Sequence, residues 1–301
     1  MFDSILGNEP IKAYLRKAVA DNRLPHAFLF TGPDGVGKSL FAKDLAIHLL
    51  GNRARVEAEI HPDFHVVRPE GKSGLHAIET LRHLIDDVHA SPFEAPAKVF
   101  LIYDAHRMQP AAANALLKTL EEPSPDTVLI LLTSAPQEIL PTIASRCSLL
   151  RFQLLAEKEI VSLLSARGLP ERFAKLAQGS AGKAFDLASK APVEETLLRL
   201  LSEKRNYPEL SLALEQIEKE VENEDPVKQA ANVEHIFAAI LMWRRDQEAR
   251  RFGAPLFFPD AQEPKRVLPS LTELERTVDE ARLAVSRNMR LSVCLEKIFT
   301  I

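Results

Sequence analysis

Residues 32–39 read Gly32-Pro33-Asp34-Gly35-Val36-Gly37-Lys38-Ser39, and this stretch decides the fold of the chain. It follows the run Ala27-Phe28-Leu29-Phe30, which is apolar on both sides, as expected of a buried parallel strand. It precedes a stretch with helical spacing of apolar residues that we expect to end at Gly51. A strand, a glycine-rich turn ending in Lys-Ser and a helix form the phosphate-binding P-loop pattern. The plainer alternative is a glycine turn that merely starts a helix.

The P-loop pattern predicts a nucleotide site with Mg²⁺. Glycines let backbone N–H groups approach phosphates, and the helix N-terminus adds favourable partial charge. Lys38 is predicted to reach the β- and γ-phosphates, and the Ser39 hydroxyl to ligate Mg²⁺ together with Asp104. We therefore expect ATP or ADP with Mg²⁺ as the cofactor. The predicted nucleotide-binding residues are Gly32, Gly35, Val36, Gly37, Lys38, Ser39, Leu40, Asp104, Thr133 and Ser134.

Asp104 ends a second apolar run, residues 99–103, and is the candidate for the acidic residue that steadies the metal. A plain helix N-cap is the alternative reading of an Asp at this point. A third apolar run, residues 128–132, ends at Thr133 and Ser134. Either of these two could sense the γ-phosphate, and either could be only a polar strand terminus.

The alternation of strand and helix signals up to about residue 155 predicts an α/β parallel sheet. The last strand is expected at residues 149–152. Beyond it, helical patterns dominate. We expect three domains: residues 1–155 for the nucleotide-binding sheet, 156–200 for a small helical lid and 201–301 for a helical oligomerisation collar. Four prolines in residues 252–269 predict an extended loop between helices of the collar.

Composition excludes several classes of protein. With 301 residues, of which 46% are apolar and 27% charged, the chain is expected to be globular with more than one domain. A net charge of −4 argues against coating nucleic acid by bulk positive charge. Cys147 and Cys294 are the only cysteines, which fits a reducing compartment and a cytoplasmic location. Neither an export signal nor a membrane span is expected.

Three further segments make a family resemblance specific. They are residues 114–123 (Asn-Ala-Leu-Leu-Lys-Thr-Leu-Glu-Glu-Pro), the pair Pro136-Gln137 and the triplet Ser145-Arg146-Cys147. Together with the P-loop they resemble the clamp-loader AAA+ family of bacterial DNA replication, densely over residues 2–152 and more diffusely beyond. In that family the arginine of the Ser-Arg-Cys triplet points into the nucleotide site of the neighbouring subunit. The resemblance therefore implies that Arg146 is catalytic in trans. Without it, Arg146 would be a surface arginine at a helix end.

Departures from the family's ATP-hydrolysing gamma/tau subunits indicate a different role within the same assembly. Ala105 stands where those subunits carry the glutamate that orients the attacking water, and Gly182 stands where they carry a sensor arginine. Residues 52–60 hold no cysteine where relatives often insert a zinc module, so no zinc is expected. His61 and His65 alone would make an incomplete ligand shell, and we expect them to be solvated or locally hydrogen-bonded.

The resemblance implies a subunit of a DNA polymerase clamp loader whose own ATPase is absent or very weak. Its implied partners are gamma/tau and delta subunits, with the sliding beta clamp and primer-template DNA reached through the complex. Two other functions remain open: an active ATPase subunit of the gamma/tau type, and a free-standing P-loop enzyme. The intact P-loop favours the first of these two, and Ala105 and Gly182 oppose it. The second needs substrate residues that the sequence does not display.

Overall fold

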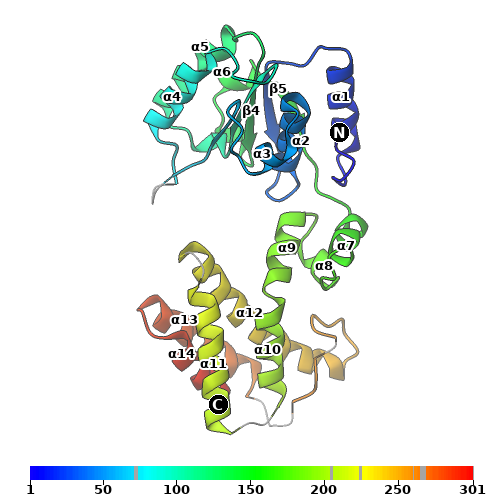
Figure 1. Ribbon diagram of the computed structural model, residues 1–301. Coiled ribbons are helices and arrows are strands. Elements are labelled where there is room, and N and C mark those ends of the chain that lie inside the picture. Colours follow the sequence, from blue (N-terminus) through cyan, green and yellow to red (C-terminus); the bar gives the residue numbers. More distant parts are fainter. Residues whose placement is uncertain (71–73, 204–205, 224–225, 260, 265–268, 301) are drawn as a thin grey trace. The chain divides into compact units, whose positions relative to one another are not determined.

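The computed structural model describes residues 1–70, 74–203, 206–223, 226–259, 261–264 and 269–300. Its first part is built on a five-stranded parallel sheet (Figure 1), which confirms the predicted α/β class. The strand order is β2-β3-β4-β1-β5. The strands are β1 (Ala27–Thr31), β2 (Phe64–Val67), β3 (Lys98–Ile102), β4 (Thr127–Thr133) and β5 (Ser148–Arg151). Strands β1, β3, β4 and β5 each coincide within a residue or two with a segment predicted to be a strand.

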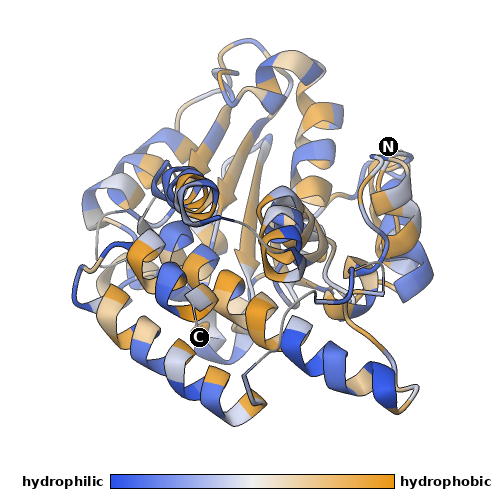
Figure 2. Ribbon diagram, turned by 90° about the horizontal axis from the view of Figure 1, so that it is seen from below, coloured by the Kyte–Doolittle hydropathy of each residue, from blue (hydrophilic) through white to orange (hydrophobic). Residues whose placement is uncertain are grey.

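Helices cover both faces of the sheet, because its central strands are apolar on both sides. Phe28 and Phe30 point to one face and pack with Leu15 of α1 (Glu9–Ala20) and Phe41 of α2 (Lys38–Leu50). The alternate positions of the strands face α4 (Ile78–Val88), α5 (Pro110–Glu121) and α6 (Pro141–Ala144). Figure 2 shows the strands coloured as hydrophobic, with helices of mixed character around them. A short helix, α3 (Arg53–Glu57), was not predicted from the sequence.

The register of the strands brings the predicted site residues to one edge of the sheet. Thr31 at the end of β1 lies opposite Thr133 at the end of β4, and the Gly32 amide donates to the Thr133 carbonyl over 3.3 Å. Ile102 of β3 lies opposite Leu131 of the same β4. Parallel strands end at the same side, so the P-loop, Asp104 and Thr133 follow the carboxyl ends of three adjacent strands.

Residues Met1–Phe185 form one compact unit and Asp186–Ile301 a second. After the sheet, the first unit contains α7 (Glu157–Ser165), α8 (Phe173–Leu176) and the start of α9 (Ala181–Ser189). The second unit contains the remaining helices: α10 (Ala191–Ser202), α11 (Tyr207–Glu222), α12 (Pro226–Arg251), α13 (Leu271–Ser286) and α14 (Leu291–Thr300). Helix α10 lies in the range predicted as lid, yet Leu197 and Leu201 pack in the core of the second unit with Trp243 of α12. The division into three domains stays a prediction.

The C-terminal unit is entirely helical in its described residues. Ile236, Phe237 and Ile240 recur at helical spacing in the centre of α12 and are buried. Residues 253–259, 261–264 and 269 between α12 and α13 contain no helix or strand, which agrees with the predicted loop. None of the helices within the described ranges combines the length and the apolar character required to cross a membrane.

Candidate functional site

The P-loop connects β1 directly to α2, and its glycines are required by close backbone approach. Gly32 has a φ of 144°, and a Cβ there would lie 2.5 Å from the carbonyl oxygen of Phe152. Gly37, at a φ of 99°, is the N-cap of α2 in a left-handed conformation. Side chains at these two positions would strain the backbone or clash. The turn is therefore a tight cradle at a helix N-terminus, the arrangement that binds phosphate groups.

Lys38, the first residue of α2, is buried, and its ammonium group folds back over the preceding P-loop. Its Nζ donates to the carbonyl oxygens of Gly32 and Pro33 over 2.6 and 2.8 Å, and lies 3.6 Å from a carboxylate oxygen of Asp34. Burial lowers the pKa of Lys38, while the charges of Asp34 and Asp104 act in the opposite direction. The carboxylate of Asp34, which lies beside Lys38, opposes the effect of burial more strongly than that of Asp104.

Asp104 begins a single turn of 3-10 helix, η1 (Ala105–Arg107), in a left-handed backbone conformation with φ of 44°. Within the described part of the chain its side chain makes no capping hydrogen bond. The N-cap alternative therefore lacks the contact that defines it. His76 packs against this turn and is fully buried. Its Nε2 lies 2.7 Å from the carbonyl oxygen of Tyr103 and 3.3 Å from that of Asp104. Burial lowers the pKa of His76.

Ala105, which follows Asp104, is only 2% exposed. Its methyl group packs in the core between the sheet and α5. A side chain at this position faces the interior, and a methyl group cannot polarise water. His106 is engaged elsewhere, since its Nδ1 lies 3.1 Å from the Thr133 hydroxyl.

Thr133 and Ser134 differ in their surroundings. Thr133 is fully buried, and its hydroxyl accepts a hydrogen bond from the Ala135 amide over 3.1 Å while it also contacts His106. A hydroxyl carries one hydrogen, so a hydrogen donated to His106 is not free for a phosphate. Ser134 is partly exposed. The choice between the two as γ-phosphate sensor stays a prediction.

The N-terminus of α9 packs directly on the P-loop. Ser180 Oγ donates to the carbonyl oxygen of Asp34 over 2.8 Å, and the Gly182 amide donates to that of Gly35 over 2.9 Å. A Cβ on Gly182 would lie 2.7 Å from the Gly35 Cα. The position noted in the sequence only for its missing arginine is thus a point of backbone-to-backbone contact.

Arg146 lies away from this cradle, just beyond α6. Its side chain is 35% exposed, and Nη2 lies 2.6 Å from a carboxylate oxygen of Glu121 at the end of α5. Its Nη1 donates to the carbonyl oxygen of Thr142 over 2.9 Å. The next residue, Cys147, is directed inward, and burial raises the pKa of its thiol to about 12. Arg146 is therefore presented at the surface by a turn that is anchored in the core.

The structure brings the P-loop, Asp104 and Thr133 to one edge of the sheet and leaves Arg146 apart from them, and nucleotide binding by the first group stays a prediction. The sequence reasoning missed His76, Ser180 and Glu121, which support these residues. A buried histidine and a helix-start serine carry no motif of their own, so only their contacts identify them. Glu121 stands inside the quoted segment 114–123, but nothing in the spacing connects it to Arg146.

Among the residues that the structure describes, no three His, Cys, Asp or Glu side chains gather as metal ligands. His61 is 4% exposed, and its Nδ1 accepts the amide hydrogen of Asp63 over 3.1 Å. His65 is partly buried and stacks on Phe100 with ring centres 4.6 Å apart. The sequence predicts that these histidines are either solvated or locally hydrogen-bonded. For His61 the second alternative is confirmed, because the side chain is buried and hydrogen-bonded.

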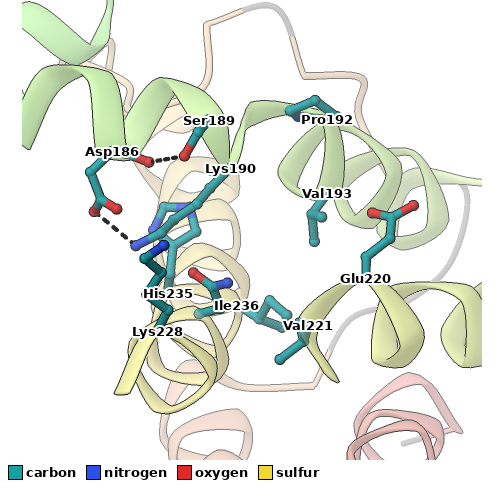
Figure 3. Close-up of a pocket in the computed structure, with 11 residues that line it drawn as sticks. Asp186, Ser189, Lys190, Pro192, Val193, Glu220, Val221, Lys228, His235 and Ile236 are labelled. Carbon is teal, nitrogen blue, oxygen red and sulfur yellow. Dashed lines mark hydrogen bonds and ion pairs between the residues drawn. The ribbon is translucent and has the colours of Figure 1, made fainter. Parts of the chain in front are cut away.

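A separate cavity of about 470 Å³ lies in the C-terminal unit (Figure 3). Lys190 Nζ lies 2.9 Å from the Asp186 carboxylate on one side of it, and His235 on α12 bonds the buried Glu194 over 3.1 Å. No residue predicted to bind nucleotide lines this cavity. It is therefore distinct from the P-loop site.

The sequence and structure of this chain were compared with those of known proteins, and the matches include DNA polymerase III subunits. A family model described as "DNA polymerase III, delta subunit" matches residues 7–156. The delta' subunit of DNA polymerase III from Bacillus subtilis is 37% identical over 174 residues, which cover 54% of this chain and 52% of that protein. The delta' subunit from Pseudomonas aeruginosa is 39% identical over 135 residues, 40% of this chain and 41% of that protein.

The tau/gamma subunit of DNA polymerase III from Haemophilus influenzae is 33% identical over 210 residues, 63% of this chain and 30% of that protein. The chain thus spans about half or less of the length of these curated relatives. Among solved structures, a gamma subunit-related protein from Thermotoga maritima aligns with a TM-score of 0.48 at 18% identity, over 97% of both chains. Residues 7–156 of this chain thus match the family model of DNA polymerase III delta subunits, and delta' subunits are among the relatives of the chain.

Proposed function

We propose that this chain is a delta-prime-type subunit of a bacterial clamp loader. It helps to load the sliding beta clamp on primer-template DNA and supplies Arg146 as an arginine finger to ATP held by a neighbouring subunit. One contrast carries the proposal. Asp104 is followed by a buried alanine in place of a water-orienting carboxylate, whereas Arg146 holds an exposed guanidinium outside its own P-loop site.

Arginine suits a task in trans for chemical reasons. Its guanidinium is permanently charged and planar, and donates two parallel hydrogen bonds to phosphate oxygens as charge develops there. In comparable phosphoryl-transfer sites an arginine finger contributes on the order of 10³–10⁵ in rate. A lysine would keep the charge and lose the fork.

The chain's own P-loop is proposed to hold ATP or ADP with Mg²⁺ without efficient hydrolysis. The residues fit the group: Gly32 and Gly37 leave room where a Cβ would strain or fill the cradle, and Lys38 supplies a buried ammonium. Ser39 and Asp104 would hold the metal ion, which neutralises phosphate charge when bound. Gly35 and Val36 complete the loop, and Leu40 follows in the first turn of α2. Because Ala105 cannot orient water, the bound nucleotide would stabilise the folded subunit and would not be hydrolysed efficiently.

The proposed partners are gamma/tau and delta subunits, and the proposed location is the cytoplasm. The C-terminal helices, with α10 among them, are proposed as the collar that enters the ring, and the part of residues 156–200 before α10 as the lid. The second candidate is an active gamma/tau-type ATPase, which the intact P-loop favours. ATP hydrolysis by the isolated chain would separate the two.

The test of the proposed function is an Arg146→Ala chain assembled with wild-type gamma/tau and delta subunits. DNA-stimulated ATP hydrolysis and clamp loading should fall by at least tenfold, while nucleotide binding by the isolated variant stays at the wild-type value. Arg151→Ala is the matched control, since Arg151 is an exposed arginine on the adjacent strand β5. Unchanged activity of the Arg146→Ala complex would reject the proposal.

A further inference from the structure

Arg146 is held at two points before any partner is present. Its Nη1 donates to the carbonyl oxygen of Thr142 one turn earlier in the chain, and its Nη2 lies 2.6 Å from Glu121 Oε1. Glu121 is 25 positions away in sequence and belongs to another element, the end of α5. The ion pair therefore connects two segments that only the fold brings together.

Both ends of this connection are fixed to one core. Thr119 and Leu120 of α5 are buried, and the Leu120 carbonyl oxygen lies 3.1 Å from His26 Nε2. On the arginine side, Ile143 is buried and Cys147 packs against the same apolar cluster as Leu120. The backbone positions of Glu121 and Arg146 are thus fixed by buried neighbours, so the two side chains extend from defined points of the fold.

Helix stability does not account for Glu121. It is the last residue of α5, where the negative end of the helix dipole disfavours a carboxylate, and Glu122 beside it adds like charge. Its ion pair is also half exposed, with side-chain exposures of 35% and 50%, and such pairs contribute little to folding. The ion pair of this carboxylate with Arg146 gives a better explanation for its presence at an unfavourable helix end than helix stability does.

We propose that Glu121 is a positioning residue that holds the Arg146 guanidinium in the direction needed to meet the phosphate of a neighbouring subunit's ATP. The inference rests on the proposed function and adds a residue to it. A free arginine side chain loses about 2 kcal/mol of rotamer entropy when it is immobilised. Glu121 and Thr142 impose this order in advance, so less is lost when the subunits meet.

The geometry leaves donors for the phosphate. A guanidinium carries five N–H groups. Arg146 Nη1 donates to the Thr142 carbonyl oxygen and, over 3.5 Å, to Ser145 Oγ, and Nη2 forms the ion pair with Glu121. Among the described residues Nε makes no hydrogen bond, so Glu121 contacts the arginine while the Nε–H remains as a donor for a phosphate oxygen.

The experiment is a double-mutant cycle in the complete complex with gamma/tau and delta subunits on primed DNA. The variants are Glu121→Gln, Arg146→Ala and the pair together, with Glu122→Gln as the control for an exposed glutamate at the same helix end. ATP hydrolysis at saturating ATP is measured together with the affinity of each chain for the complex. Glu121→Gln should lower the rate by about 5- to 30-fold, the range that corresponds to 1–2 kcal/mol, with unchanged affinity for the complex.

In the Arg146→Ala background, Glu121→Gln should have no further effect, because a positioning residue acts only through the group it positions. Glu122→Gln should match wild type. An unchanged rate for Glu121→Gln, or an additive loss in the double variant, overturns the inference. A faster rate overturns it as well, since Glu121 would then compete with the phosphate for the arginine. If Arg146→Ala itself changes nothing, the proposed function fails, which is a separate result.

Discussion

The backbone amide of Gly182 donates a hydrogen bond to the carbonyl oxygen of Gly35, which joins the start of α9 to the P-loop over 2.9 Å. Ser180 adds a second contact, from its hydroxyl to the Asp34 carbonyl. Two glycines meet here without side chains, and neither position has room for a Cβ facing the other. The geometry of the nucleotide cradle is therefore coupled to the start of α9 by one backbone hydrogen bond and one from a serine hydroxyl.

We predict that Gly182→Ala destabilises the chain by about 1–3 kcal/mol, because the added methyl forces the P-loop and α9 apart. Helix propensity predicts the opposite sign, since alanine is favoured over glycine in helices by about 1 kcal/mol. Chemical denaturation of the full chain measures the difference. Lys183→Ala, at the next and exposed position of α9, is the control. If Gly182→Ala is as stable as the wild-type chain or more stable, the contact between Gly182 and Gly35 can open without a loss of folding free energy, and the prediction is wrong.

Nucleotide binding should depend on Lys38. Lys38→Ala is expected to abolish binding of ADP or ATP with Mg²⁺, because the loop loses the cation that faces the phosphates. Equilibrium titration of the isolated chain checks this. Lys43→Ala serves as control, since Lys43 lies on the same helix but pairs with Glu59 at 2.7 Å. If the wild-type chain itself binds no nucleotide, the P-loop is closed by its own packing and the prediction fails.

The isolated chain should hydrolyse ATP more slowly than about one turnover per second, the lower end of ordinary enzyme rates. Ala105 offers no group to orient water, and the His106 ring is engaged with Thr133. Phosphate release from the purified chain measures the rate, with His106→Ala as a second sample that should behave identically. Faster turnover that His106→Ala removes would assign the missing role to His106.

Asp63 should be important for the stability of the first unit. Its buried carboxylate accepts the amide hydrogens of Phe93, Glu94 and Ala95 over 2.6–2.9 Å. We expect Asp63→Asn to cost about 2–4 kcal/mol, because the amide NH₂ group turns a donor towards backbone donors. Urea unfolding measures this, with the exposed Asp21→Asn as control. A loss no greater than that of the control would contradict it.

The same residue predicts a dependence on acid. Burial alone would raise the pKa of Asp63, but the three backbone N–H groups act more strongly and hold it below the ordinary value of 3.8. A depressed pKa contributes stability that is present above pH 3.8 and is lost as pH falls through the folded-state value. The stability of the wild-type chain should therefore decline more steeply than that of Asp63→Asn as pH falls below about 4.

The C-terminal helices are expected to carry assembly. The sequence places the boundary of the collar between residues 200 and 201, which is inside α10. Because α10 packs in the C-terminal core, a chain ending at Lys190 should remain folded and lose assembly, whereas one ending at Glu203 should expose Leu197 and Leu201 and aggregate. Size-exclusion chromatography and binding to the partner subunits check both. Assembly of the shorter chain at unchanged affinity would contradict the assignment.

The sequence by itself determined the α/β class, the strands and the P-loop, because these depend on local properties. A continuous apolar run can be buried only between two layers, and glycines at fixed spacing permit only certain turns. The resemblance to ATP-hydrolysing subunits made Ala105 informative, since it stands where the resemblance implies a carboxylate. The family resemblance, which suggested a role for Arg146, likewise rests on adjacent residues.

Only the tertiary structure decided which residues support those of the site. Glu121 meets Arg146, Ser180 and Gly182 meet the P-loop, and His76 lies under Asp104, although each pair is far apart in sequence. It also placed α10 with the C-terminal core, where the sequence pattern had left it with the lid. Helical periodicity predicts which face of a helix is buried but not which element packs against that face. The hydrophobic effect is non-directional, so any apolar neighbour stabilises the buried face to a similar extent. Partners across the fold are chosen by shape and by hydrogen bonds that form only once the chain has packed.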